Sequence, residues 1–88
     1  MAKALSPHEA IRAALARRRP GASICPTDAA RLMGEEDWRA ALPAVHAAAR
    51  ELAAKGQVLL TRRGLPVTEP RGAYRIVRAA GGSQMPQR

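Results

Sequence analysis

The stretch "RELAAKGQVLLTRRGLPVTEPRGAYRIV", residues 50–77, decides the fold because it changes from one secondary structure to another. It begins with helical residues and reaches Gly56, a residue type that commonly closes a helix. The next run, "QVLLT", predicts a strand with Val58 and Leu60 on the same face. A helix that leads directly into a strand therefore lies at the centre of the fold.

A second predicted strand, "AYRIVR", ends the stretch. Tyr74 and Ile76 share one face of this strand and Arg75 lies on the other. The connection between the strands, "RRGLPVTEPRG", contains two prolines and two glycines and is too long for a tight hairpin turn. It carries three basic residues, Arg62, Arg63 and Arg71. Together these segments predict a small antiparallel sheet with a basic loop.

Two helices are predicted ahead of this stretch. "SPHE" places Ser6 at an N-cap, Pro7 at the first helical position and Glu9 where a capping box requires it, and this helix should end near Arg18. "ASICP" follows and predicts a short edge strand or an extended connector. Thr27 is then predicted to cap a second helix, "DAARLM", which the next glycine closes.

The third helical segment, "EEDWRAALPAVHAAARELAAKG", has one apolar stripe at helical spacing. Its members are Trp38, Leu42, Val45, Ala49 and Leu52. Pro43 interrupts the segment, because it lacks a backbone N–H and crowds the carbonyl four residues earlier. Two structures fit the pattern: one kinked helix, or a short helix followed by a longer one. In both, the continuous stripe faces a single core.

Size and composition indicate one small domain. The chain has 88 residues, only two aromatic side chains and a hydrophobic fraction of 47% that is largely alanine. We expect a tail over residues 1–5, a domain over 6–78 and a disordered tail over 79–88. The single cysteine, Cys25, excludes an intrachain disulfide, and we expect neither a signal peptide nor a membrane span, and hence a cytoplasmic protein.

The charge is strongly positive and unevenly distributed. The net charge is +8 and the pI about 11.5. Residues 1–20 carry net +4, residues 21–56 net −1 and residues 57–88 net +5. A balance this basic indicates a polyanionic partner such as nucleic acid. The positive charge belongs to the end of the first helix, the basic loop and the tail, and not to the second and third helices.

The order of elements resembles a winged helix-turn-helix domain: helix, short strand, helix, helix, strand, basic loop, strand. Ala30 and Gly34 stand four apart, as the small residue and turn glycine do in many helix-turn-helix units. "RELAAKGQVLLTRRG" resembles the junction at which the recognition helix of winged-helix regulators enters the first wing strand. The resemblance covers residues 6–78. The "DWR…PAV…A…LA…G" core is also similar to a family of small uncharacterised bacterial proteins.

This resemblance implies an α+β fold with three helices and a β wing, and it implies binding of double-stranded DNA. The third helix would lie in the major groove and the basic loop would hold phosphate. Pro43 shares the groove-facing side of the third helix and offers only an apolar contact. The implied nucleic-acid-binding residues are Arg39, His46 and Arg50 on the third helix, and Arg62, Arg63 and Arg71 in the loop.

Other features leave alternatives open. Glu35, Glu36 and Asp37 lie at the N-terminal end of the third segment, where carboxylates would repel phosphate, and they favour a winged helix that binds a protein partner or a second copy of itself. RNA binding fits the same charge argument. The run Arg17 to Arg19 at the end of the first helix is explained by solubility and the helix dipole. No nucleophile with its base, phosphate loop or metal-ligand spacing is present, so we expect no enzymatic activity, cofactor or metal.

Overall fold

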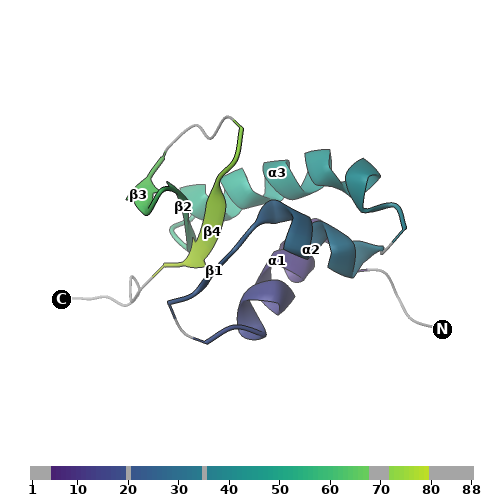
Figure 1. The fold of residues 1–88 in the computed structure, drawn as a ribbon, viewed down its shortest axis with the longest axis horizontal. Helices are drawn as coiled ribbons and strands as arrows, with labels where there is room; N and C mark the ends of the chain where they lie inside the picture. The colour runs from purple at the N-terminus through teal and green to yellow at the C-terminus, as the bar shows by residue number, and fades with distance from the viewer. Residues whose placement is uncertain (1–4, 20, 35, 68–71, 80–88) are drawn as a thin grey trace.

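The computed structural model describes residues 5–19, 21–34, 36–67 and 72–79 (Figure 1). The described part contains three helices and a four-stranded sheet of order β1-β4-β2-β3, in which every pair is antiparallel. This confirms the α+β fold class, and the layout is consistent with a winged helix. The elements are α1 (Pro7–Ala16), β1 (Ser23–Ile24), α2 (Pro26–Met33), α3 (Trp38–Ala54), β2 (Val58–Arg62), β3 (Leu65–Pro66) and β4 (Arg75–Arg78).

Several sequence-based predictions concern residues outside the described ranges. They include the predicted role of Arg71 in binding nucleic acid and the predicted repulsion of phosphate by Glu35. The two predicted tails also lie outside these ranges, apart from Leu5 and Ala79.

The start of α1 agrees with the prediction. The Ser6 hydroxyl accepts a hydrogen bond from the Glu9 backbone N–H at 3.1 Å, and the Glu9 carboxylate accepts one from the Ser6 N–H at 2.9 Å. This reciprocal capping box satisfies two backbone donors that a helix start leaves unpaired. The helix ends at Ala16, two residues before the predicted end, and the next two N–H groups bond three residues back.

The start of α2 differs from the prediction. Pro26 occupies the first helical position and Cys25 is the N-cap, so Thr27 lies inside the helix and the prediction that it caps the helix is wrong. Proline suits the first position because its missing N–H would have no partner there. The Asp28 carboxylate accepts a hydrogen bond from the Cys25 N–H at 3.1 Å and thereby serves the cap. Gly34 ends the helix, as predicted.

Helix α3 is one continuous helix of 17 residues, which decides between the two alternatives at Pro43. Pro43 lies within the first half of the helix on an exposed face. The predicted apolar stripe is confirmed: Val45, Ala49 and Leu52 are buried, while Trp38 and Leu42 pack against the core from its edge.

In the sheet, β4 lies between β2 and β1 and pairs with both. Val58 pairs with Arg78 and Leu60 with Ile76, while Ile24 of β1 pairs with Ile76 from the other side. The predicted alternation is confirmed, since Val58, Leu60, Tyr74 and Ile76 are buried and Arg75 is exposed. The short strand predicted for "ASICP" is confirmed as the edge strand β1.

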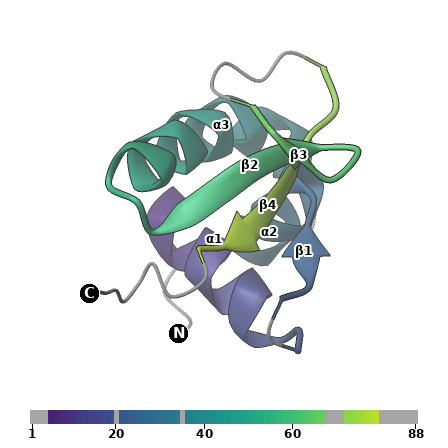
Figure 2. The same ribbon diagram turned by 90° about the vertical axis from the view of Figure 1, so that its left-hand side faces the viewer.

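The connection between β2 and β4 contains a tight turn that the sequence did not predict. β3 folds back on β2 with Arg62 paired to Leu65. Arg63 and Gly64 form the two-residue turn and have φ angles of 54° and 82°. Such a turn requires positive φ at both central residues, and Arg63 is the unusual occupant because a Cβ disfavours this conformation. Turned by 90°, the molecule shows the sheet on one side and the helices behind it, with the core between them (Figure 2).

Candidate nucleic-acid interface

The outward face of α3 carries the residues that the resemblance assigned to the major groove. Arg39, Pro43 and Arg50 are exposed, and His46 is half-buried. Arg39 and Arg50 are separated by eleven residues, which corresponds to about 16 Å along a helix axis. The surface between them is mostly exposed apolar side chains: Ala40, Pro43, Ala44 and Ala47. Cations therefore lie near both ends of the face, and small apolar groups lie along its middle.

His46 connects α3 to the residue before β4. Its Nδ1 lies 2.6 Å from the Tyr74 hydroxyl in a hydrogen bond for which either group can be the donor, and the two ring centroids are 5.5 Å apart. Burial raises the pKa of Tyr74, and the positive charge of Arg50 opposes that rise. His46 is therefore not a free surface histidine: its Nδ1 is engaged, and Nε2 is the ring nitrogen left for an outside contact.

The hairpin of β2 and β3, which we call the wing, carries Arg62 and Arg63. Arg62 donates a hydrogen bond from Nε to the carbonyl of Ala73 at 3.1 Å and so links β2 to the segment before β4. Arg63 occupies the β2–β3 turn and is exposed. The part of the chain that the structure describes therefore places two of the three predicted wing arginines, and Arg71 lies outside it.

Two hollows meet at Tyr74. The first, of about 200 Å³, lies between α3 and the wing and is lined by His46, Arg50, Gly72 and Tyr74. The second, of about 510 Å³, also has Tyr74 in its lining, together with Cys25, Arg62, Arg63, Ala73 and Arg75. Among the described residues, none that lines either hollow is acidic. The structure thus brings four of the six predicted site residues into the linings of two hollows that share one buried tyrosine.

Arg39 does not join this group. It lies at the other end of α3, where its guanidinium carbon is 4.4 Å from the centroid of the Trp38 ring. Arg31 of α2 approaches the same ring at 5.1 Å. Two guanidinium groups at an indole are a cation–π arrangement that steadies both arginines at the α2–α3 corner. The spacing of residues along the chain did not reveal Arg31 as a neighbour of Arg39.

Arg75 is a second basic residue that the sequence analysis left out of the site. Its Nε donates to the Ser23 hydroxyl at 2.9 Å and its Nη2 donates to the Ser23 carbonyl at 3.0 Å. Alternation along "AYRIVR" placed Arg75 on the outward face of the strand. Its position beside Arg62 and Arg63 depends on the pairing of β4 with both β1 and β2, which the sequence does not state.

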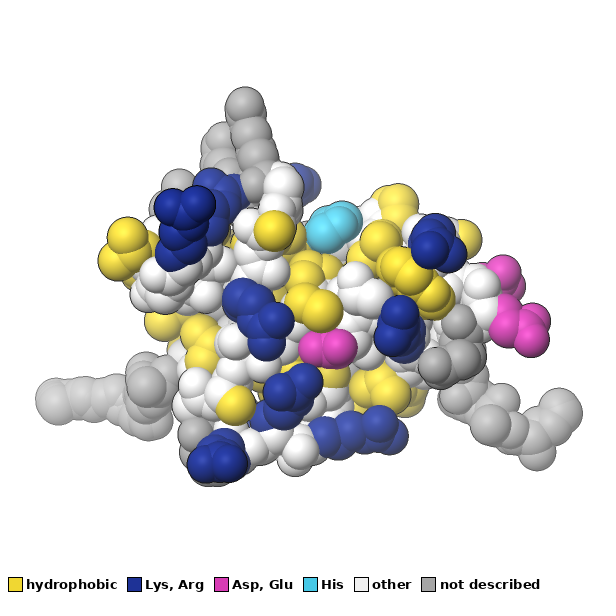
Figure 3. All heavy atoms as spheres, in the orientation of Figure 1, with side chains coloured by type: hydrophobic (Ala, Val, Ile, Leu, Met, Phe, Trp, Pro, Cys, Tyr) yellow, Lys and Arg dark blue, Asp and Glu magenta, His cyan; other side chains and the backbone are white. Residues whose placement is uncertain are grey.

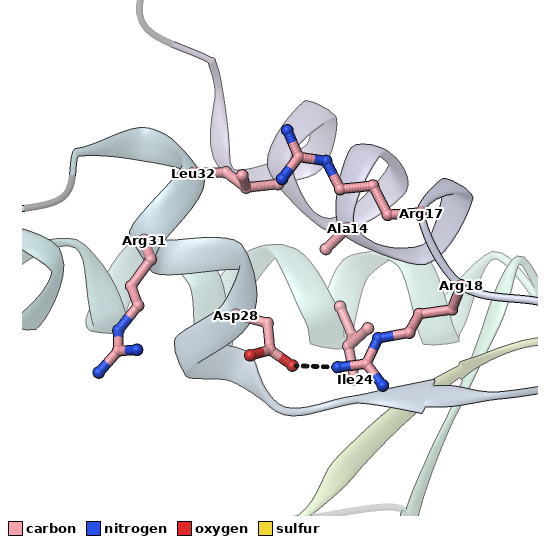
Figure 4. A pocket seen from close by; sticks show the side chains of 7 residues that line it. All are labelled: Ala14, Arg17, Arg18, Ile24, Asp28, Arg31 and Leu32. Carbon is pink, nitrogen blue, oxygen red and sulfur yellow. Dashed lines mark ion pairs between the residues drawn. The ribbon is translucent and has the colours of Figure 1, made fainter.

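The arginines at the end of α1 form a different environment. Figure 4 shows the Arg18 guanidinium reaching the Asp28 carboxylate of α2, at 3.6 Å, while Arg17 extends away toward Leu32. Both partners of the pair are partly exposed, and such surface ion pairs contribute little to stability. Arg17 and Arg18 point in different directions. This geometry fits the prediction that the run at the end of the first helix serves solubility and the helix dipole.

Basic side chains outnumber acidic ones on the face of the molecule drawn in Figure 3. Figure 3 shows Lys and Arg side chains spread over the wing, the sheet edge and the ends of α1 and α2, with few acidic side chains among them. Over the described ranges, no group of three potential metal ligands occurs. No helix in those ranges is long and apolar enough to cross a membrane.

Comparison with known proteins identifies the family. Residues 4–79 match the family described as "Protein of unknown function (DUF3253)". The match covers most of the 88 residues, and the chain belongs to this family. No curated protein matches the chain.

Proposed function

We propose that the chain is a winged-helix protein that binds double-stranded DNA without catalysing a reaction. The observation that carries the proposal is the grouping of basic side chains in the two hollows that share Tyr74. His46 and Arg50 approach from α3, and Arg62 and Arg63 approach from the wing. In a winged helix, the recognition helix enters the major groove and the wing contacts the adjacent backbone.

The wing and the outward face of α3 offer different contacts to DNA. Arg62 ends β2 and Arg63 lies in the turn that follows, where exposed guanidinium groups suit paired contacts to phosphate oxygens. On α3, Arg39, His46 and Arg50 are the side chains that reach base edges or phosphate, since the exposed side chains between Arg39 and Arg50 are apolar. Phosphate contacts position a protein without reading sequence. We therefore expect binding that is dominated by charge, with a low preference for sequence, in the cytoplasm where bacterial DNA lies.

Salt dependence follows from this mechanism. Each phosphate that an arginine neutralises releases condensed counterions, and the slope of log K against log salt is about −0.9 per phosphate on duplex DNA. Contacts from the four described arginines of the predicted site would give a slope of roughly −3 to −4.

A second function is favoured by a specific observation on α3. Exposed Ala40, Ala44 and Ala47 with Pro43 form an apolar face, and exposed Glu36 and Asp37 precede the helix. Such a face suits close packing against a protein, and the carboxylates repel phosphate. A winged helix that binds a protein partner or a second copy of itself is therefore the alternative.

Paired charge variants distinguish the two functions. The double variant Arg62→Gln/Arg63→Gln removes two wing cations, and Arg17→Gln/Arg19→Gln removes two cations from the end of α1 as a matched control. Fluorescence anisotropy with a labelled mixed-sequence duplex measures the affinity and its salt slope for each. We expect the wing variant to reduce the magnitude of the slope by about 2 and the control to leave it nearly unchanged. Equal losses in both would show unspecific attraction and would favour the protein-binding alternative.

A further inference from the structure

The hydrogen bond between His46 and Tyr74 joins α3 to the residue before β4. Nδ1 of His46 lies 2.6 Å from the Tyr74 hydroxyl, and the two ring centroids are 5.5 Å apart at an interplanar angle of 48°. Tyr74 is buried, and His46 is half-buried on the outward face of α3. The tyrosine therefore holds the imidazole from the inside, on the helix that we propose enters the major groove.

The chemistry of the two groups decides which one donates this hydrogen bond. A neutral imidazole has one N–H and one nitrogen with a lone pair, and that nitrogen is basic enough to take a proton at about pH 6.5. A phenol oxygen is a far weaker base, and its O–H is a better donor than an imidazole N–H. Burial raises the pKa of Tyr74, so the hydroxyl keeps its proton. The Tyr74 O–H therefore donates to Nδ1 of His46, and the proton of the neutral imidazole belongs to Nε2.

The direction of the second ring nitrogen follows from the shape of imidazole. Nδ1 and Nε2 point out of the ring in nearly opposite directions, so Nε2 is directed away from Tyr74 while Nδ1 faces the hydroxyl. Within the described part of the chain, the imidazole makes no second hydrogen bond. Protonation of the ring adds a proton at Nδ1 and leaves the Nε2–H in place. His46 thus presents an N–H donor at Nε2 whether the ring is neutral or charged.

A donor on this face selects what it can contact on duplex DNA. In the major groove, purine N7 is an acceptor at every base pair, whereas the exocyclic amino groups of adenine and cytosine only donate. Phosphate oxygens also accept. We infer that Tyr74 is a positioning residue that holds His46 as a hydrogen-bond donor through Nε2, and that this donor contacts an acceptor on DNA, either purine N7 or a phosphate oxygen. The inference rests on the proposed DNA binding and adds which nitrogen of His46 makes the contact and what holds it there.

The tautomer of His46 is measured first, in the free protein without DNA. Long-range ¹H–¹⁵N NMR spectra at about pH 8.5, where a histidine of ordinary pKa is neutral, distinguish the two ring nitrogens. We expect Nε2 to have the chemical shift of a protonated nitrogen and Nδ1 that of an unprotonated acceptor. A proton on Nδ1 would overturn the inference, because Nε2 would then be an acceptor.

Tyr74→Phe tests whether the hydroxyl sets this tautomer. Phenylalanine keeps the packing of the ring and removes only the donor to His46. We expect the nitrogen shifts of His46 to become averages of two exchanging tautomers, a change that a purely structural role of Tyr74 would not cause. Unchanged nitrogen shifts in the variant would overturn the positioning role.

The contact with DNA is measured by fluorescence anisotropy with a labelled mixed-sequence duplex at about 150 mM salt. We expect Tyr74→Phe and His46→Ala each to weaken binding by about 3- to 10-fold, the range that one hydrogen bond provides. The double variant should bind no more weakly than His46→Ala alone, because Tyr74 acts through His46. Losses that simply add in the double variant would overturn the inference.

Ser6→Ala is the matched control for lost stability. It removes one hydrogen bond at the start of α1, on a different helix from the proposed contact. We expect it to change the affinity for the duplex by less than about twofold. A loss equal to that of Tyr74→Phe would mean that stability, and not the imidazole, decides the affinity, and the inference would be overturned.

A duplex with 7-deazapurines in place of its purines separates the two acceptors, because it lacks N7 and keeps every phosphate. If the loss caused by His46→Ala disappears on this duplex, the acceptor is purine N7; if it remains, the acceptor is a phosphate oxygen. Either result supports the donor role. An Nδ1–H tautomer in a protein that binds the duplex would overturn this inference alone, whereas a wild-type protein that does not bind the duplex would refute the proposed function with it.

Discussion

Replacing Pro43 by alanine should stabilise the protein. Pro43 is the sixth residue of α3, and its ring lies on an exposed face without core burial. Because proline has no N–H, the carbonyl of Arg39 has no hydrogen-bond donor four residues ahead of it. Alanine restores that donor and removes the crowding between the ring and the carbonyl.

The size of the effect can be worked from two opposing contributions. Proline in a helix interior is about 3 kcal/mol less favourable than alanine. Alanine makes the unfolded chain more flexible, which costs about 0.4 to 1 kcal/mol of stability. The Arg39 carbonyl is near the helix start and close to water, which reduces the first contribution. The net gain should be about 1 to 2 kcal/mol, which for a domain of this size raises the melting temperature by roughly 5 to 15 °C.

Thermal and urea unfolding followed by circular dichroism measure this change. Pro66→Ala in the exposed edge strand β3 is the matched control, because the same substitution there restores no helical hydrogen bond. We expect the control to be neutral or slightly destabilising, and the urea slope of Pro43→Ala to be unchanged. A neutral or destabilised Pro43→Ala would refute the reasoning, since it would mean that the proline ring stabilises α3.

Three other predictions follow from contacts in the core and at the helix start. Tyr74→Phe removes the hydrogen bond to His46 and should lower the free energy of unfolding by about 1 kcal/mol, measured by urea unfolding; no change would mean that the bond contributes nothing. Leu52→Ala, at a side chain only 1% exposed, should cost about 2 to 5 kcal/mol and leave much of this small domain unfolded, whereas a fully folded variant with an unchanged melting temperature would contradict the described core. The hydrogen bonds from Ser6 lower the pKa of Glu9 below its ordinary 4.5, so the stability they provide is fully present above pH 4.5 and is lost as the pH falls through the lowered value. Glu9→Gln removes the titrating carboxylate and should reduce that acid dependence in urea unfolding between pH 6 and 3, and an identical pH profile would contradict this assignment.

Much of the fold could be predicted because local signals decide it. The capping box at Ser6 and the stripe from Trp38 to Leu52 depend on neighbours within a few residues, and the structure confirms both. The cap of α2 was mispredicted because Thr27 and Pro26 are both good helix-start residues, and proline at the first position places the cap on Cys25. The tight turn was missed because Arg63 is a residue type that rarely takes positive φ.

The site was harder to predict because it depends on tertiary contacts. Helical periodicity in the sequence predicted that Arg39, His46 and Arg50 share one face of the third helix. The hydrogen bond between His46 and Tyr74 joins residues 28 apart, and the one between Arg75 and Ser23 joins residues 52 apart. No local pattern encodes either pair. The sheet order β1-β4-β2-β3 brings Arg75 to the wing arginines, and that order is a property of the whole chain.

A residue-resolved NMR titration with a mixed-sequence DNA duplex tests the central claim most directly. The titration is made at low salt and again at about 150 mM salt, where exposed charges are screened beyond about 8 Å. The account predicts shifts that persist at the higher salt and map onto His46, Arg50, Arg62 and Arg63, in the two hollows that share Tyr74. Shifts that include distant arginines such as those at the end of α1 and vanish at the higher salt would contradict it.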